Sequence, residues 1–430
     1  MSSPAVLRSG MAARTLRPED LDRSVPIYVV WETTLRCDHA CAHCGSRAGD
    51  AREDELETAE LLAVADALAR LGTREVTLIG GEAYLRGDVY ELIAHLAGHG
   101  IRVTMQTGGR GLTATRCRKL AEAGLAAIGV SIDGPAEVHD VLRASPGSHA
   151  AALAGVAHAR EAGLLVTSNT QVNRLNRGRL RETAALLEAA GVQVWRAQMT
   201  APMGNAADRP DWILQPYMIL DVLDTLAAIQ TEAIERARAA GTKPTFRVAL
   251  GNNLGYFGPH ESLLRGRPGD DRYWHGCQAG RYVMGIESDG TIKGCPSLPT
   301  GPYVGGNVRE IALEDLWAHS EVIGFTRDRG LDELWGWCKT CYYAELCRAG
   351  CSFTAHSTLG RRGNNPFCWH RADAHRQQGL REVLVHADLA AGTPYDFGRF
   401  TLAVEPWVDD APEAGATSSP GSRRSLPIVT

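Results

Sequence analysis

Three cysteines lie close together near the start of the chain, in the segment "CDHACAHCGS" at residues 37 to 46. They are Cys37, Cys41 and Cys44, and their C-x3-C-x2-C spacing directly follows the apolar run "IYVVWETT". Zinc ions and iron-sulfur clusters usually take four protein ligands. A loop with three cysteines therefore either borrows a fourth ligand from elsewhere or leaves one coordination position of its metal free.

A second group of cysteines lies between residues 277 and 368. Four of its members follow a C-x2-C-x5-C-x3-C spacing, and the other three stand apart from them. The seven are Cys277, Cys295, Cys338, Cys341, Cys347, Cys351 and Cys368. A zinc ribbon is one interpretation, although a zinc ion needs only four ligands. The remaining cysteine, Cys117, lies in a helical pattern and is expected to be a half-buried small hydrophobic residue.

Composition restricts the class of protein. The chain has 430 residues, 44% hydrophobic and 22% charged, which suits a globular protein with one large core and a smaller second unit. The net charge of -5 and the lack of a long basic stretch argue against a nucleic-acid partner. No apolar run approaches the ~20 residues of a membrane span, so we expect no membrane partner and a cytoplasmic location. In that compartment many cysteines indicate metal sites.

Short β-rich runs alternate with helical stretches from about residue 27 to residue 200. The strand candidates are 27–33, 75–81, 101–108, 125–134, 164–172 and 192–200. Most of the helical stretches between them end in a glycine, as C-caps do, at Gly72, Gly100, Gly124, Gly163 and Gly191. Strands separated by helices predict parallel pairing through right-handed crossovers. The pattern therefore predicts an open or closed α/β barrel.

Polar residues stand at the carboxyl ends of the predicted strands, where α/β barrels carry their chemistry. Each one alone is equally well explained as a helix cap or a turn residue. Their coincidence with the cysteine loop at the end of the first strand favours a site. After the second to sixth strands they are Glu82, Gln106, Ser131 with Asp133, Asn169 with Gln171, and Gln198.

The cysteine loop after the first strand, "GGE" after the second and "SIDG" after the fourth resemble the radical S-adenosylmethionine (SAM) superfamily. The resemblance implies that Cys37, Cys41 and Cys44 hold three irons of a 4Fe-4S cluster. It implies that the fourth iron binds the amino and carboxylate groups of SAM. Reductive cleavage would then give a 5'-deoxyadenosyl radical, which abstracts hydrogen from an unactivated carbon.

The same resemblance implies a set of SAM-binding residues. They are Gly80, Gly81, Glu82, Gln106, Ser131, Asp133 and Arg143. Glycines let backbone approach the ligand, and the carboxylate of Glu82 can pair with the methionine ammonium. Arg143 suits the methionine carboxylate, with Ser131 as a neutral donor nearby. The alternatives are an exposed helical arginine for Arg143 and a simple turn for the "DG" that contains Asp133.

The second cysteine group resembles the SPASM extension of these enzymes, which carries two auxiliary iron-sulfur clusters. The resemblance assigns Cys277, Cys295 and Cys351 to the first auxiliary cluster. It assigns Cys338, Cys341, Cys347 and Cys368 to the second. The first cluster is thus one cysteine short, and three explanations stay open: an open iron, a ligand other than cysteine, or a smaller cluster.

The fold implied is a partial parallel (β/α)6 barrel followed by a small cysteine-rich SPASM domain. The expected parts are an N-terminal extension (1–24), the radical SAM partial barrel (25–240), a bridging segment (241–270), the SPASM domain (271–400) and a disordered tail (401–430). From the short extension we expect no fused leader-recognition domain. A separate leader-peptide recognition protein is therefore a candidate partner.

Proteins that resemble this one mostly modify ribosomally synthesised peptides by thioether, carbon-carbon or related crosslinks. The resemblance thus implies an oxidoreductase that matures a peptide or protein substrate, with an external flavodoxin or ferredoxin as electron donor. One alternative is a sulfatase-maturase-like side-chain dehydrogenase, although Pro296 stands where those enzymes carry an aspartate. Another is a non-catalytic electron carrier or peptide-binding scaffold. The sequence does not identify the general base, the substrate or the bond that is formed.

Overall fold

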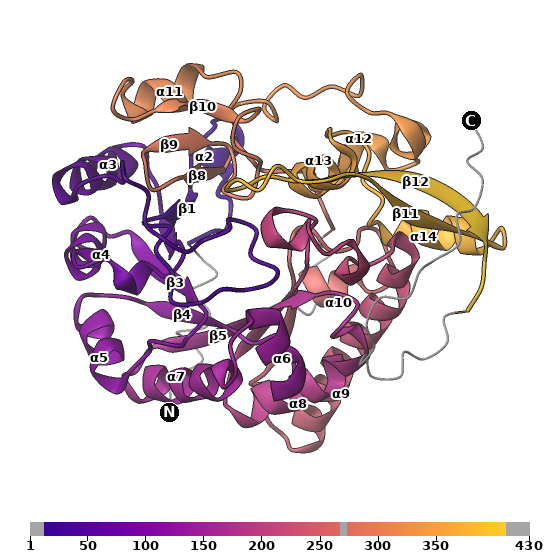
Figure 1. The fold of residues 1–430 in the computed structure, drawn as a ribbon, viewed down its shortest axis with the longest axis horizontal. Helices are drawn as coiled ribbons and strands as arrows, with labels where there is room; N and C mark the ends of the chain where they lie inside the picture. The colour runs from indigo at the N-terminus through magenta and orange to yellow at the C-terminus, as the bar shows by residue number, and fades with distance from the viewer. Residues whose placement is uncertain (1–12, 267–272, 410–430) are drawn as a thin grey trace.

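A ten-stranded sheet forms the centre of the protein, with helices along its outer side (Figure 1). The structure is a computed structural model that describes residues 13–266 and 273–409. The strand order is β10-β9-β8-β1-β2-β3-β4-β5-β6-β7. The first seven strands are β1 Tyr28–Glu32, β2 Glu75–Ile79, β3 Arg102–Thr107, β4 Ala127–Ser131, β5 Leu165–Val172, β6 Val194–Met199 and β7 Arg247–Leu250.

The strands β1 to β7 are all parallel, so the predicted barrel of parallel strands is confirmed. The strands β2 and β4 are buried on both faces over most of their length, as parallel strands are when helices cover them. The strand β7 was not predicted. It lies within the segment expected only to bridge the two domains, and its four residues are too few to show a periodic pattern.

The helices that cover the sheet follow the predicted alternation. In α3, the buried residues Leu61, Val64, Ala65 and Leu68 recur at the spacing of one helix face. All five predicted C-cap glycines have a positive φ, between 77° and 102°. The helices are α3 Thr58–Arg70, α4 Val89–Gly98, α5 Ala114–Glu122, α6 Ala136–Arg143, α7 Ser148–Glu161, α8 Leu180–Ala189 and α9 Ile219–Ala239.

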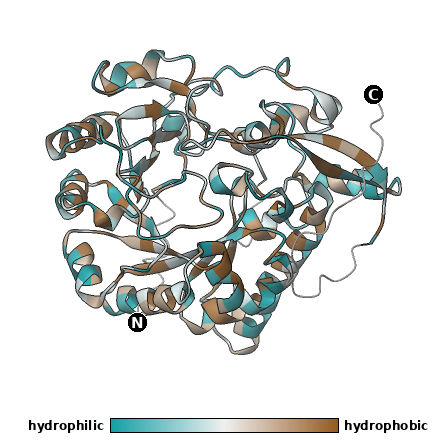
Figure 2. Cartoon of the chain, viewed as in Figure 1, coloured by the Kyte–Doolittle hydropathy of each residue, from teal (hydrophilic) through white to brown (hydrophobic). Residues whose placement is uncertain are grey.

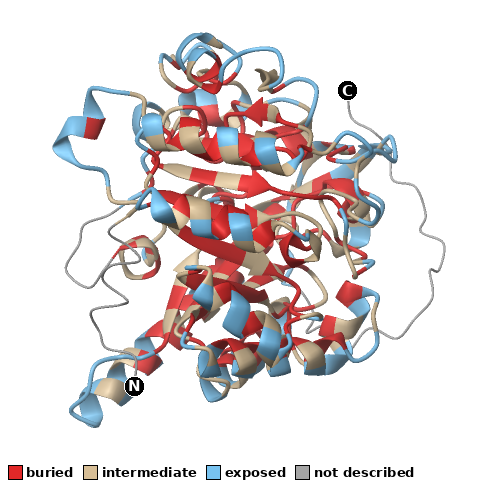
Figure 3. Cartoon of the chain, turned by 90° about the vertical axis from the view of Figure 1, so that its left-hand side faces the viewer, coloured by how far each residue is buried: buried red, intermediate tan, exposed pale blue. Residues whose placement is uncertain are grey.

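Burial follows this layering. Apolar residues concentrate on the strands and on the helix faces that turn toward them, and hydrophilic residues face outward (Figure 2). Figure 3 shows the same arrangement as buried strands beneath helices with exposed outer faces. One stretch of the described chain, Pro210–Ala239, is long and apolar enough to cross a membrane. Its apolar window is 61% buried inside the protein, as expected for a core helix.

The segment before β1 is part of the folded structure from residue 13 onward. It contains the short helix α2 Pro18–Leu21. The guanidinium of Arg14 lies 3.6 Å from the ring centre of Tyr28 and forms an ion pair with the buried carboxylate of Glu75. Both partners are the first residues of their strands, so this segment packs against the amino ends of β1 and β2.

The cysteine-rich segment continues the barrel sheet. The strand β8 Val283–Ile286 pairs in parallel with β1, and β9 Thr291–Lys293 and β10 Val304–Asn307 follow as antiparallel neighbours. The two predicted domains therefore share one sheet. The remaining α-helices of the described chain are α10 Glu261–Arg265, α11 Leu313–His319, α12 Ala344–Cys347, α13 Ser352–Leu359 and α14 Trp369–Arg376.

A hairpin of β11 Leu380–Asp388 and β12 Arg399–Pro406 forms a separate two-stranded sheet. The prediction of a disordered tail from residue 401 is therefore wrong for residues 401–406, which pair with β11. Pairing with β11, about 20 residues earlier, stabilises this strand. The prediction of disorder rested on the Pro- and Ser-rich composition of the residues that follow it. Residues 410–430 lie outside the described part of the chain.

Candidate active site

The three loop cysteines follow β1 at the carboxyl ends of the parallel strands. Each sulfur has an N–H donor close by: the backbone N of His39 lies 3.4 Å from Cys37 Sγ, and the backbone N of Ala48 lies 3.4 Å from Cys44 Sγ. The Arg143 guanidinium lies 3.8 Å from Cys41 Sγ. Donors of this kind stabilise negatively charged sulfur, as metal-bound thiolate requires.

Two of the loop thiols, Cys37 and Cys41, have raised pKa values. Burial, reinforced by the neighbouring thiols, raises the pKa of Cys37 to about 12 and that of Cys41 to about 11. All three cysteines are free of disulfide bonds. Thiols with pKa values this high lose their protons readily only when a metal centre binds them, because its positive charge offsets the effect of burial. The donor set therefore fits an iron-sulfur cluster with three cysteine ligands.

The two glycines of "GGE" allow backbone to approach backbone. A Cβ on Gly80 would lie 2.3 Å from the carbonyl oxygen of Thr34, and one on Gly81 would lie 2.2 Å from that of Arg36. The backbone N of Gly81 donates to Thr34 at 2.8 Å, and that of Glu82 donates to Arg36 at 2.8 Å. The glycines thus dock the end of β2 on the entry to the cysteine loop, which places Glu82 beside the cysteines.

Glu82 is a buried carboxyl group just after the end of β2. It accepts hydrogen bonds from Thr107 Oγ1 at 2.5 Å and from the backbone N of Gly108 at 2.6 Å. Burial raises its pKa to about 8 in spite of these two bonds. Within the described residues no lysine, arginine or histidine forms an ion pair with it. A buried acid of this kind fits the ammonium group of a ligand.

Arg143 and Asp133 form a buried ion pair. The Arg143 nitrogens Nε and Nη2 lie 2.8 and 2.6 Å from Asp133 Oδ2, and the backbone N of Gln171 donates to Oδ1 at 2.9 Å. Against the effect of burial, the guanidinium holds the pKa of Asp133 down at about 2. Arg143 is only 8% exposed, so its interpretation as an exposed helical arginine is wrong. Asp133 holds the guanidinium beside the cysteine loop.

Gln106 and Ser131 lie on the neighbouring strands β3 and β4. The side-chain amide of Asn169, on β5, donates a hydrogen bond to Gln106 Oε1 across β4. A Cβ on Gly129 would lie 2.0 Å from that same oxygen, so the glycine makes room for the bond. Ser131 is half-buried at the end of β4 and stands in register with Asn169. These side chains form a polar strip across three strands.

His39 is a site residue that the sequence did not single out. Its side chain is buried, and within the described chain neither ring nitrogen has a hydrogen-bond partner. Burial lowers its pKa to about 4, so the ring is neutral at physiological pH. A Cβ on Gly108 would lie 2.6 Å from His39 Nε2, which places the imidazole near Glu82. Its only sequence signal is its position between two loop cysteines.

The tip of the β11–β12 hairpin, residues 389–398, binds the cysteine loop. Arg47, three residues after Cys44, lies 2.8 and 3.1 Å from the two carboxylate oxygens of Asp396. The hydroxyl of Tyr395 donates to the buried carboxylate of Glu32, the last residue of β1. No local pattern could have indicated these contacts, because the partners stand 349 and 363 residues apart.

The structure brings together the same three cysteines that the resemblance assigned to the first auxiliary cluster. Burial, and then the thiols of Cys277 and Cys351, raise the pKa of Cys295 to about 12. Burial followed by Cys277 raises the pKa of Cys351 to about 11. Tyr303 packs in the same cluster as Cys277 and Cys295, and its hydroxyl lies 2.9 Å from His356 Nδ1.

The other four cysteines line one pocket, which is open to solvent. Burial and neighbouring thiols raise the pKa of Cys368 to about 12, so these side chains also perturb one another. Aromatic rings surround them and reduce contact with water, which influences the reduction potential of a cluster. The pocket is lined by Cys338, Cys341, Cys347 and Cys368, with Tyr256, Phe257, Trp337, Tyr343 and His370 among the surrounding rings.

Comparison with known families identifies two parts. The radical SAM superfamily matches residues 31–187, and SPASM, an iron-sulfur cluster-binding domain, matches residues 277–342. The chain belongs to the radical SAM superfamily and carries a SPASM domain. A radical SAM/SPASM enzyme uses SAM, the 4Fe-4S cluster that binds it, and auxiliary iron-sulfur clusters.

The relatives have different named activities. The chain is 30% identical to the mycofactocin maturase MftC of Mycolicibacterium smegmatis, over 80% of this chain and 82% of that protein. It is 28% identical to the AdoMet-dependent heme synthase of Nitratidesulfovibrio vulgaris, over 80% of this chain and 92% of that protein. The solved structure of anSMEcpe with bound AdoMet and the Cp18Cys peptide has the same fold, with a TM-score of 0.62, 17% identity, and coverage of 81% of this chain and 95% of that one.

Proposed function

We propose that this radical SAM enzyme modifies a ribosomally synthesised peptide, forming a thioether, carbon-carbon or related bond after hydrogen abstraction. The observation that carries the radical chemistry is the three-thiol loop beside the buried Glu82 and the buried Arg143. The likeness to a mycofactocin maturase over four fifths of the chain supports a peptide substrate.

The proposal gives each residue of the site a physical role. The thiolates of Cys37, Cys41 and Cys44 hold the cluster that binds SAM. Glu82 accepts the methionine ammonium, and Arg143 binds the methionine carboxylate through Nη1, the one guanidinium nitrogen that does not contact Asp133. When bound, the cluster and SAM supply the 5'-deoxyadenosyl radical.

Two further cluster sites follow from the grouping of the remaining cysteines. The set of Cys338, Cys341, Cys347 and Cys368 that lines the pocket offers four thiolates, which is a complete ligand set for a 4Fe-4S cluster. The set of Cys277, Cys295 and Cys351 offers three, so this cluster takes a ligand other than cysteine, keeps an open iron, or is smaller. Both clusters would carry electrons between the substrate and an external donor.

The partners of the proposed reaction follow from its chemistry. Cleavage of SAM needs one electron, which a flavodoxin or ferredoxin would deliver. A separate protein that recognises the leader of the peptide is the second expected partner. A cytoplasmic location would supply all of these components together with reduced thiols.

The likeness to AdoMet-dependent heme synthases favours a second candidate, radical modification of an iron porphyrin that precedes heme. The cysteine loop, Glu82 and Arg143 serve this reaction equally well, because they act on SAM and not on the substrate. The two candidates therefore differ in the molecule that loses hydrogen.

A single set of assays tests the function. The protein is reconstituted anaerobically with iron and sulfide, reduced, and supplied with SAM. Short peptides encoded beside the gene are added in one arm, and an iron porphyrin in another. We expect 5'-deoxyadenosine in both arms and a mass change only in a peptide. A variant without the three loop thiols is the control. A changed porphyrin with unchanged peptides would contradict the peptide substrate and support the porphyrin. Absence of 5'-deoxyadenosine would contradict both candidate functions.

A further inference from the structure

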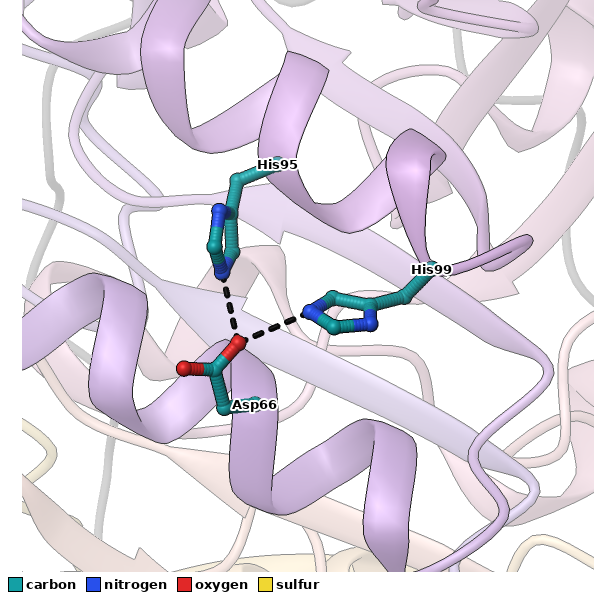
Figure 4. A group of neighbouring side chains, drawn as sticks. All are labelled: Asp66, His95 and His99. Carbon is teal, nitrogen blue, oxygen red and sulfur yellow. Dashed lines mark hydrogen bonds and ion pairs between the residues drawn. The ribbon is translucent and has the colours of Figure 1, made fainter.

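Two histidines and an aspartate converge on the outer helical layer (Figure 4). Asp66 lies on α3, His95 lies in the last turn of α4, and His99 caps the end of α4. The Nε2 atoms of His95 and His99 lie 2.7 and 2.8 Å from the same oxygen, Asp66 Oδ1. The two rings meet edge to face with centroids 5.0 Å apart. Two nitrogen donors and one oxygen donor therefore point at one another.

These three side chains have no role in the proposed cleavage of SAM. They lie toward the ends of α3 and α4 that precede β2 and β3, whereas the cysteine loop lies at the opposite ends of the strands. Within the described residues Asp66 pairs with no lysine or arginine, and the nearby Arg70 is bound to Glu314 at 2.7 Å. Within the described chain the side chains that bond to Asp66 are those of His95 and His99.

The electrostatics of the cluster suit a cation. Hydrogen bonds from His95 and then His99 lower the pKa of Asp66, so it is a carboxylate at neutral pH. The end of α4 contributes the partial negative charge of its last carbonyl groups. All three side chains are between 32% and 44% exposed, so an ion can reach them from solvent.

We propose that Asp66, His95 and His99 bind one divalent transition-metal ion, with Zn²⁺ as the first candidate. Two imidazoles and one carboxylate select such an ion over Mg²⁺ or Ca²⁺. Ligands of one tetrahedral zinc ion lie about 3.3 Å apart, as follows from metal-ligand lengths of about 2.0 to 2.1 Å. The three side chains must therefore open by about half an ångström from their hydrogen-bonded positions, and their exposure permits this. Water completes the coordination.

The expected consequence is a link between α3 and α4, the helices that lead into β2 and β3. The competing explanation is a hydrogen-bonded network in which both imidazoles donate to Asp66 and no metal binds. A second histidine–aspartate pair on the surface, with one histidine only, serves as a control that should not bind the metal ion. His260 and Asp224 form an exposed pair at 3.1 Å with a single histidine.

The test uses the cluster-loaded enzyme, because free cluster thiols would themselves bind zinc. The wild type, His95→Gln/His99→Gln and the control His260→Gln are equilibrated with buffered Zn²⁺, and zinc per chain and the unfolding temperature are measured. We expect one zinc ion fewer in the double variant, and affinity at least tenfold weaker in Asp66→Asn. Zinc should raise the unfolding temperature of the wild type and control only. Equal zinc content in wild type and double variant would overturn the proposal, as would an equal shift in unfolding temperature.

Discussion

Replacing Glu82 by Gln should stabilise the protein and at the same time weaken SAM binding. The pKa of Glu82 is about 8 in the folded protein, against an ordinary value of 4.5. At pH 7.5 the unfolded chain carries a charge there, and folding must neutralise it. Three pH units correspond to about 4 kcal/mol, so this carboxyl group opposes folding by a few kcal/mol. Gln keeps the shape and the acceptor oxygen without that cost.

The pH dependence of stability follows from the same raised pKa. Below about pH 4.5 the carboxyl group is protonated in both the folded and the unfolded chain, so it does not oppose folding. Above that pH the unfolded chain loses the proton and the protein loses stability, until the folded protein loses the proton too at about pH 8. We therefore expect the unfolding temperature of the wild type to fall between pH 6 and pH 8 more steeply than that of Glu82→Gln. The gap between the two proteins should widen as the pH rises.

The effect on SAM has the opposite sign. A charge-assisted hydrogen bond contributes about 1.5 to 3 kcal/mol, so its loss should weaken SAM binding by about ten- to over one-hundredfold. Anaerobic unfolding curves and equilibrium dialysis with SAM measure the two effects on cluster-loaded protein. Glu137→Gln is the control, since its carboxylate is exposed. A Glu82→Gln protein that is less stable at pH 7.5 and binds SAM normally would refute the reasoning.

Three further outcomes are expected. Replacing the three loop cysteines by Ala should abolish 5'-deoxyadenosine formation while the iron of the two SPASM sites remains, and loss of all iron would contradict the separate cysteine groups. Asp133→Asn leaves the buried Arg143 guanidinium without its charged partner, so it should lower the free energy of unfolding by about 3 to 5 kcal/mol. Glu137→Gln, in a surface ion pair, should lower it by under ~1 kcal/mol. Equal effects of the two variants in denaturant titrations would contradict a buried ion pair. Tyr395→Phe removes a buried hydrogen bond to Glu32 and should cost about 1 to 3 kcal/mol in the same titrations, and an unchanged midpoint would show that the hairpin tip does not anchor there.

The sequence determined those features that depend on neighbouring residues. Most helices and strands up to residue 200 follow from apolar spacing and from glycines that end the helices, and six predicted strands are present as β1 to β6, whereas α6 is an additional helix between β4 and α7. The cysteine loop and "GGE" were recognisable for the same reason, since their residues are close together in the chain. The order of strands then placed both at one end of the barrel.

Only the tertiary structure decided features that join distant segments. The strand β7 has only four residues and depends on pairing with β6, and β12 is stabilised by pairing with β11. The contact of the hairpin tip with the cysteine loop joins residues 349 positions apart, so no local pattern encodes it. The three-residue cluster of Asp66, His95 and His99 has the same origin, because its members meet only when α3 packs beside α4.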